Sequence, residues 1–165
     1  MVDEDVNRAR DLVAFQISSR TSLAGKIWVA RRLRMILEDS AQQLWMYRAI
    51  VRKADNEMVG HLSFHHKFPD PDLAQFSNSG VELGYTIEPG YRRMGYARES
   101  IMGMIGWARA EQTDADVFVT ISPENQPSMQ LAGSLGFIKV GENQDELDGL
   151  EYVMKWQPKY QKTNH

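Results

Sequence analysis

Residues 81–110 constrain the fold of this chain more than any other stretch. Apolar side chains alternate along Val81–Ile87, which is typical of a strand that buries one face and carries Glu82 on the other. Pro89 breaks the strand, and apolar residues then return at helical spacing, so a helix is predicted to begin near Gly95 or one residue later. A strand, a basic glycine-containing turn and a helix therefore follow one another.

The turn before this helix has the properties of an anion site. The predicted helix start lacks Ser, Thr, Asp and Asn, so its first backbone N–H groups have no side-chain cap. Arg92 and Arg93 add positive charge, and Gly95 lets the backbone approach a ligand closely. A phosphate group would fit these donors. An ordinary strand-to-helix connection with hydrated N–H groups and solvated arginines explains the same residues equally well.

Composition limits the classes of function. The 165 residues suit one domain over 1–165, with a polar tail from about residue 157. The formal charge of -3 gives no general reason to expect a nucleic-acid partner. The count of 0 cysteines excludes disulfides, thiolate zinc sites and a cysteine nucleophile. Because the N-terminus is acidic and no apolar run reaches membrane-spanning length, we expect a soluble, cytoplasmic protein with no membrane partner.

The rest of the chain alternates between predicted helices and strands. The strand at Asp116–Ile121 follows the long helix, so it is predicted to pair in parallel with Val81–Ile87 through a right-handed crossover. Asn125 or Gln126 can cap the next helix, and Gly136 suits the left-handed position that ends it. The other predicted elements are helices at Asp3–Ser18, Leu23–Asp39 and Pro127–Leu135, strands at Trp45–Lys53, Met58–His65, Phe137–Gly141 and Leu150–Trp156, and a loop at Lys67–Ser79 that could cover a substrate mouth.

Histidines in the second hairpin strand raise the question of a metal site. His61, His65 and His66 lie near Asp70 and Asp72 in the sequence. Positions 61 and 65 of an extended strand are about 13 Å apart at about 3.3 Å per residue, which is too far for one zinc ion to bridge. We therefore predict no metal.

Four short motifs follow one another along the chain, and each is weak singly. They are Glu82-Leu83-Gly84-Tyr85, Arg92-Arg93-Met94-Gly95-Tyr96-Ala97, Ser122-Pro123-Glu124-Asn125-Gln126-Pro127-Ser128 and Leu135-Gly136-Phe137. In this order and at this spacing they resemble the GNAT superfamily of acetyl-CoA-dependent N-acetyltransferases, and in particular the branch that includes ribosomal-protein and antibiotic N-acetyltransferases. The resemblance covers roughly residues 45–156.

The resemblance implies a fold and a cofactor site. The fold would be α+β (α/β three-layer), with a mixed, splayed central sheet flanked by helices and acetyl-CoA in the opening of the sheet. Family members usually begin with a strand before the first helix, and this sequence offers no clear counterpart. The implied cofactor-binding residues are the pantetheine-pairing Tyr85, Thr86 and Ile87, the pyrophosphate-binding Arg92, Arg93, Met94, Gly95, Tyr96 and Ala97, and the downstream Asn125 and Ser128.

The resemblance also implies direct attack of a primary amine on the thioester. Glu82 is the implied general base, and Tyr152 is the candidate acid that protonates the leaving thiolate. For Glu82 the competing interpretation is a sheet-surface carboxylate paired with a lysine or arginine, and for Tyr152 it is simple packing, with Ser128 as a rival acid. The acceptor, a small-molecule or peptide amine, is not specified by the sequence.

Other classes of function stay open beside the N-acetyltransferase. One is a catalytically silent acyl-CoA-binding module, and another is a phosphate-binding protein with no role for CoA. The pairing of Asn125 and Ser128 with the arginine loop favours the N-acetyltransferase and the acyl-CoA-binding module over the phosphate-binding protein. The oligomeric state is open as well, and a homodimer is the commonest outcome among soluble oligomers.

Overall fold

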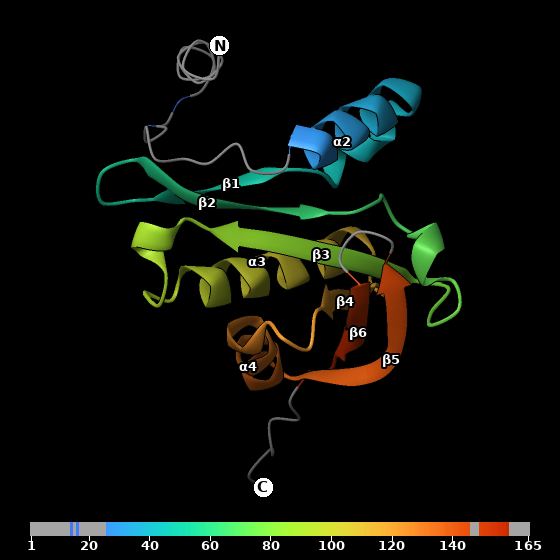
Figure 1. Ribbon diagram of the computed structural model, residues 1–165. Coiled ribbons are helices and arrows are strands. Elements are labelled where there is room, and N and C mark those ends of the chain that lie inside the picture. Colours follow the sequence, from blue (N-terminus) through green and yellow to red (C-terminus); the bar gives the residue numbers. More distant parts are fainter. Residues whose placement is uncertain (1–13, 15, 17–25, 146–148, 159–165) are drawn as a thin grey trace, which may run out of the picture. The chain divides into compact units, whose positions relative to one another are not determined.

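A computed structural model describes residues 14, 16, 26–145 and 149–158 of the chain (Figure 1). Each predicted element within these residues is present, although several boundaries differ. Short 3-10 helices lie at η1 (Ser40–Leu44), η2 (Pro71–Leu73) and η3 (Pro89–Tyr91). The helices and strands are α2 (Lys26–Glu38), β1 (Arg48–Arg52), β2 (Glu57–Phe64), β3 (Gly80–Ile87), α3 (Tyr96–Glu111), β4 (Asp116–Ile121), α4 (Gln126–Leu135), β5 (Phe137–Asp145) and β6 (Gly149–Trp156).

The strands form one mixed, six-stranded sheet in the order β1-β2-β3-β4-β6-β5. The β1–β2, β4–β6 and β5–β6 pairs are antiparallel, whereas β3 and β4 are parallel, as predicted from the strand–helix–strand order. The β3–β4 ladder is short. It covers Gly80–Glu82 of β3 and ends at the pair formed by Glu82 and Phe118.

By its internal contacts the chain divides into two compact units, and β3 and α3 contribute residues to both. Unit 1 contains the described residues up to Ser63 together with Tyr85–Ile101. It holds the β1–β2 hairpin, α2, the end of β3 and the first turns of α3. Within it, the backbone N–H of Glu88 donates to the carbonyl of Val59 at 2.9 Å and so ties the end of β3 to β2.

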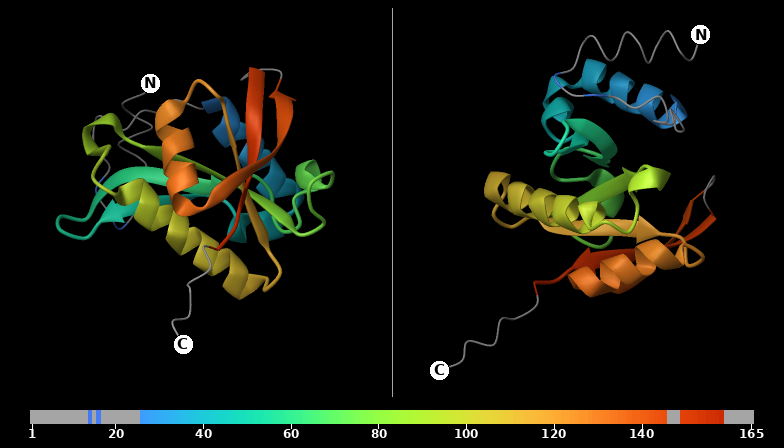
Figure 2. Two further views of the ribbon diagram at one scale, coloured as in Figure 1. Left: turned by 90° about the horizontal axis from the view of Figure 1, so that it is seen from below. Right: turned by 90° about the vertical axis from the view of Figure 1, so that its left-hand side faces the viewer.

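Unit 2 contains Phe64–Gly84 and the described residues from Met102 onward. The side chains of Leu73, Phe118 and Val153 form a buried cluster at its centre, and Phe76 packs against them. Helix α4 packs against β4 and β5 (Figure 2). Gly136 ends α4 with a φ of 97°, the left-handed conformation expected of a glycine that follows a helix.

The segment 67–79 was expected to be a loop that could cover a substrate mouth, and the structure instead anchors it in unit 2. Leu73, on the short helix η2, is 2% exposed and belongs to the buried cluster. The backbone N–H of Asp70 donates to the carbonyl of Gly80 at 2.8 Å. Because apolar side chains at 73 and 76 have a core to enter, this segment packs as part of the fold.

Some boundaries differ from the sequence predictions. Most of the helix predicted at Asp3–Ser18 lies outside the described residues, but Gln16 forms a parallel β-bridge with Glu57, so the helix prediction is wrong at Gln16. The N–H of Gln16 donates to the carbonyl of Asn56, just before β2, and the N–H of Met58 in β2 donates to the carbonyl of Gln16, both at 2.8 Å.

Two strands also have boundaries that differ from the prediction. Trp45 and Met46 precede β1 rather than belong to it, because Tyr47 has a φ of 39°, which interrupts extended backbone. Strand β5 continues beyond its predicted end at Gly141 to Asp145.

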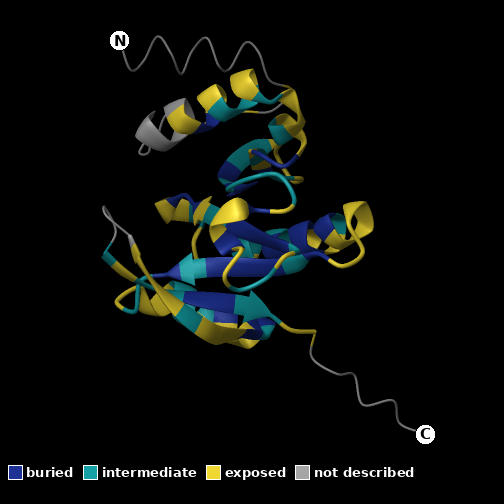
Figure 3. Ribbon diagram, turned by 90° about the vertical axis from the view of Figure 1, so that its right-hand side faces the viewer, coloured by how far each residue is buried: buried dark blue, intermediate teal, exposed yellow. Residues whose placement is uncertain are grey.

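Burial follows the sheet, as Figure 3 shows in dark blue. Val59, Val81, Val117 and Phe118 are each 0% exposed, as expected of central strands. Helix α2 differs, with Leu33 and Leu37 exposed. No helix in the described part of the chain has both the length and the apolar content needed to cross a bilayer.

Candidate active site

The loop before α3, in unit 1, has the backbone geometry of an anion site. Arg93 and Gly95 adopt positive φ values of 65° and 91°. A positive φ is uncommon for a residue with a side chain, and it marks a backbone held in place by its surroundings. Among the described residues, the N–H groups of Arg93, Met94 and Gly95 donate to no backbone carbonyl. These donors lie in an exposed loop. The first turn of α3, which follows the loop, has further N–H groups without partners inside the helix.

The two arginines of this loop have different local roles. Arg92 donates from Nε to the carbonyl oxygen of Ile87 at 3.0 Å, which fixes the loop to the end of β3. Arg92 and Arg93 are both exposed. A side chain at Gly95 would meet no other atom within 4 Å, so open space lies beside the loop backbone. The helix start predicted near Gly95 is confirmed, since α3 begins at Tyr96.

Glu82, in unit 2, is buried on β3 and has specific partners. The residue is 8% exposed, so the predicted alternative of a surface carboxylate is wrong for its position. The hydroxyl of Thr120 donates to Glu82 Oε1. His65 Nδ1 lies 3.2 Å from the same oxygen. A carboxylate held by a hydroxyl and an imidazole has a defined orientation and a group with which it can exchange a proton.

The backbone brings His65 to this carboxylate. His65 follows β2 directly, and its N–H donates to the carbonyl of Glu82 at 2.9 Å. A Cβ atom at Gly84 would lie 2.8 Å from His65 Nε2. Gly84 therefore leaves the space that the imidazole occupies, which gives a physical reason for glycine two residues after the glutamate on the same strand face.

Sequence reasoning missed both partners of Glu82, and one of them had a signal. In the parallel β3–β4 ladder Glu82 is paired with Phe118, and Thr120 lies two residues further along the same face of β4. Strand alternation plus the predicted parallel pairing would have indicated Thr120. His65 had no comparable signal, because the register of β2 against β3 is not fixed by the alternation of apolar residues alone.

The predicted site residues Tyr85, Thr86 and Ile87 are the last three residues of β3 and belong to unit 1, whereas those at the start of α4 and on β6 belong to unit 2. Asn125 caps α4, as predicted, and its Oδ1 accepts a hydrogen bond from the N–H of Ser128 at 3.3 Å. Tyr152, on β6, is paired with Ile121 and Glu142, and Lys139 Nζ lies 3.4 Å from the centre of its ring. The predicted roles of these residues in catalysis and cofactor binding stay predictions.

A second group of titratable side chains lies between β2 and the end of η2 in unit 2. His66, Asp70 and Asp72 place one potential ligand atom each within 4.8 Å of one another. Asp70 is 2% exposed, and burial raises the pKa of its carboxyl group while the nearby His66 lowers it. Asp72 N–H donates to Asp70 Oδ1 at 3.0 Å, and Asp70 Oδ2 has no hydrogen-bond partner.

Comparison with known proteins identifies the family. The model of a family described as Acetyltransferase (GNAT) domain matches residues 3–138. The chain belongs to the GNAT acetyltransferase family. This family match confirms the resemblance read from the motifs, and the mixed sheet with its helices is the GNAT fold.

Several individual proteins resemble this GNAT chain. An uncharacterized N-acetyltransferase of Bacillus subtilis, YjdG, is 32% identical over 89 residues, which are 54% of this chain and 49% of YjdG. The chain thus spans about half the length of that relative. A ribosomal-protein-S5-alanine acetyltransferase from Vibrio fischeri has a TM-score of 0.61 at 21% identity, covering 93% of this chain and 86% of that one. A variant of the spermidine N-acetyltransferase SpeG from Vibrio cholerae has a TM-score of 0.60 at 14% identity, covering 94% and 87%.

Proposed function

We propose that this protein is an N-acetyltransferase that moves an acetyl group from acetyl-CoA to a primary amine. The observation that carries the proposal, beside the family match, is the loop before α3, where the backbone is left-handed at Arg93 and Gly95, the N–H groups of residues 93–95 donate to no backbone carbonyl of the described residues, and open space lies beside Gly95. Successive N–H groups at a helix start form a concave anion site, and the pyrophosphate of CoA is an anion of matching size.

Each part of acetyl-CoA has a proposed partner. The N–H groups from Arg93 to Ala97 bind the pyrophosphate, and the exposed guanidinium groups of Arg92 and Arg93 add charge. Tyr85, Thr86 and Ile87 pair with the pantetheine arm as an added strand would. The early end of the β3–β4 ladder at Glu82 supports this role. Asn125 and Ser128 contact the pantetheine, with the free amide nitrogen of Asn125 and the hydroxyl of Ser128 as the groups not used in capping.

The reaction requires a base because amine acceptors are protonated near neutral pH. A lysine-like ammonium with a pKa of about 10.4 costs about 4 to 5 kcal/mol to deprotonate at pH 7. Glu82 accepts that proton directly or through a water molecule. The free amine nitrogen then attacks the thioester carbonyl carbon, the C–S bond breaks, and the thiolate of CoA takes a proton, with Tyr152 as the proposed donor. The nitrogen loses its second proton, which restores the donor, and Glu82 passes the first proton to solvent. One proton is released to solvent in the balance.

His65 and Thr120 have a positioning role in this scheme. Both side chains contact Glu82 Oε1, and these two contacts to one oxygen fix the orientation of the carboxylate. A fixed carboxylate loses less entropy when it receives the proton than a freely rotating one does. The backbone N–H groups near Leu83 to Tyr85 are the proposed donors to the thioester oxygen.

The test is a turnover assay with acetyl-CoA and a panel of amines. Because the protein has 0 cysteines, a thiol reagent reports only the CoA that is released. The panel includes spermidine and an alanine peptide from ribosomal protein S5, because two structural neighbours are named as acetyltransferases of these acceptors, together with lysine peptides and aminoglycosides. Release of CoA that depends on both substrates, with the acetylated amine found by mass spectrometry, supports the proposal.

Calorimetric titration of acetyl-CoA separates the alternatives. Binding without turnover on any amine would favour the acyl-CoA-binding module instead. No binding at millimolar acetyl-CoA would overturn both. The identity of the acceptor follows from the panel and not from the fold.

A further inference from the structure

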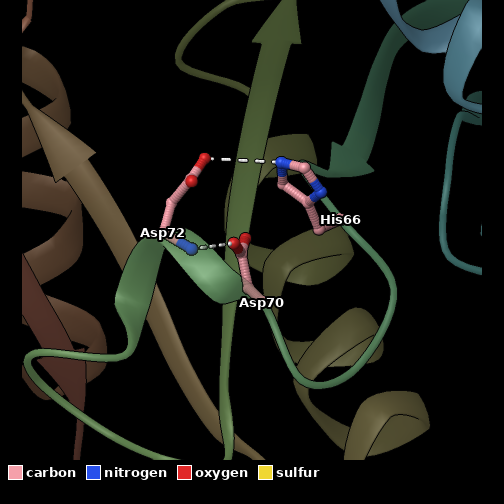
Figure 4. A group of neighbouring side chains, drawn as sticks. All are labelled: His66, Asp70 and Asp72. Atoms are coloured by element: carbon pink, nitrogen blue, oxygen red, sulfur yellow. Dashed lines mark hydrogen bonds and ion pairs between the residues drawn. The ribbon is translucent and has the colours of Figure 1, made fainter.

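His66, Asp70 and Asp72 form a compact donor group that the acetyl-transfer proposal does not use (Figure 4). They lie in unit 2: His66 shortly after β2, Asp70 as the cap of η2 and Asp72 within η2. The three side chains converge on one region, with the imidazole of His66 facing the carboxylate of Asp72 and the Asp70 carboxylate beside them. The long separation predicted between His61 and His65 does not apply here, because neither histidine belongs to this group.

Asp70 contributes a buried oxygen that no protein donor in the described residues satisfies. Asp70 is 2% exposed, and its Oδ2 has no hydrogen-bond partner, whereas Oδ1 accepts the N–H of Asp72. A buried carboxylate oxygen without a partner costs free energy. Besides His66, the carboxylates of Glu82 and Asp72 lie near enough to interact with Asp70 electrostatically. A cation placed against Oδ2 would remove this cost.

One separation in the group matches a tetrahedral ion. His66 Nε2 lies 3.3 Å from Asp72 Oδ2, and all the ligand atoms lie within 4.8 Å of one another. Ligands bound at about 2.0 to 2.2 Å from a tetrahedral zinc ion are about 3.3 to 3.6 Å apart. The His66–Asp72 pair already has this spacing, and the carboxylate of Asp70 would have to move toward the pair to bind the same ion.

The donor types select the class of metal. One imidazole nitrogen with two carboxylate oxygens suits zinc and similar transition metals, whereas magnesium and calcium prefer oxygen donors alone. Asp72 has a side chain that is 66% exposed, which gives an ion a path from solvent and leaves room for water in the remaining position. We propose that His66, Asp70 and Asp72 bind a zinc-type divalent cation, which cross-links the two ends of the 66–72 segment.

Zinc titration of the full chain after treatment with a chelator tests the proposal. We expect calorimetry to show one zinc ion per chain, and we expect affinity to fall at least about tenfold in His66→Gln, Asp70→Asn and Asp72→Asn. His61→Gln and Asp114→Asn are the matched controls, since they change the same residue types outside the group, and both should bind zinc as the unmodified chain does. Absence of binding, or equal loss in the controls, would overturn the site.

Thermal unfolding gives a second readout that is independent of acetyl transfer. In chelator, Asp70→Asn should unfold at the same temperature as the unmodified chain or at a higher one, because the substitution removes the uncompensated buried oxygen charge. In excess zinc, the unmodified chain should gain stability and Asp70→Asn should not. The exposed Asp72→Asn serves the same comparison if Asp70→Asn fails to fold. Equal stabilisation of all variants by zinc would refute the assignment.

Discussion

Glu82 combines burial with a polar pair of partners, and this combination is what makes a carboxylate useful as a base. Replacement by Gln keeps the shape and the hydrogen bond from Thr120 but removes the ability to accept a proton. We expect Glu82→Gln to lower kcat by about 10²- to 10⁴-fold while the Kd for acetyl-CoA stays unchanged in calorimetry. Glu111→Gln, an exposed change on α3, is the control. Unchanged turnover in Glu82→Gln would remove Glu82 from the mechanism.

Thr120 tests whether the orientation of Glu82 matters beyond its presence. Thr120→Val has nearly the same shape but cannot donate to Glu82 Oε1, so one charge-assisted hydrogen bond of about 1.5 to 3 kcal/mol is lost. We expect kcat to fall by about tenfold or more. Thr120→Ser keeps the hydroxyl and should keep most of the activity. If valine and serine variants have the same kcat, the hydroxyl does not position the base.

The loop before α3 is the element on which the cofactor proposal depends most. Gly95→Ala places a side chain on backbone with a φ of 91°, which is strained by about 1 to 2 kcal/mol. We expect the Kd for acetyl-CoA to rise by about tenfold, because the loop relaxes away from the geometry that presents its N–H groups. Gly103→Ala, an exposed position further along α3, should instead stabilise the protein by about 0.5 to 1 kcal/mol and leave the Kd unchanged.

The start of α4 separates a structural role from a cofactor role for Asn125. Its Oδ1 accepts the N–H of Ser128, so Asn125→Ala should destabilise the protein by about 0.5 to 2 kcal/mol in urea unfolding. Asn125→Ser retains a capping oxygen and should restore that stability. If affinity for acetyl-CoA is also restored in the serine variant, Asn125 acts only as a cap. If affinity stays low while stability recovers, the amide nitrogen contacts the cofactor.

Local patterns in the sequence predicted the elements well, and contacts between distant segments account for what they could not predict. The alternation at Val81–Ile87 and the cap and stop residues of α4 are local, and the structure confirms both elements. The anchoring of residues 67–79 depends on Leu73 meeting Phe118 and Val153, which lie far away in the chain. The pairing of His65 with Glu82 depends in the same way on the register between β2 and β3. A single domain, a cytoplasmic location and a homodimer stay predictions.

One ion pair joins distant segments of unit 2 and gives its stability a pH dependence. Asp116, the first residue of β4, accepts hydrogen bonds at Oδ2 from Lys155 Nζ on β6 and from the hydroxyl of Ser77, both at 2.7 Å. Burial by itself raises the pKa of Asp116, but the hydrogen bonds from Lys155 and Ser77 outweigh burial and hold the pKa below its ordinary value. The folded state therefore binds this proton less readily than the unfolded chain does.

The sign of the pH effect follows from the lowered pKa of Asp116. Stability from this group is fully present above the ordinary aspartate pKa and is lost as the pH falls through the folded pKa. We expect Asp116→Asn to cost about 1 to 3 kcal/mol in urea unfolding at pH 7, and the difference from the unmodified chain to shrink progressively below about pH 4. The exposed change Asp114→Asn should cost little at either pH. A difference for Asp116→Asn that stays constant from pH 7 to the acid limit of folding would show that its carboxylate charge does not stabilise the fold.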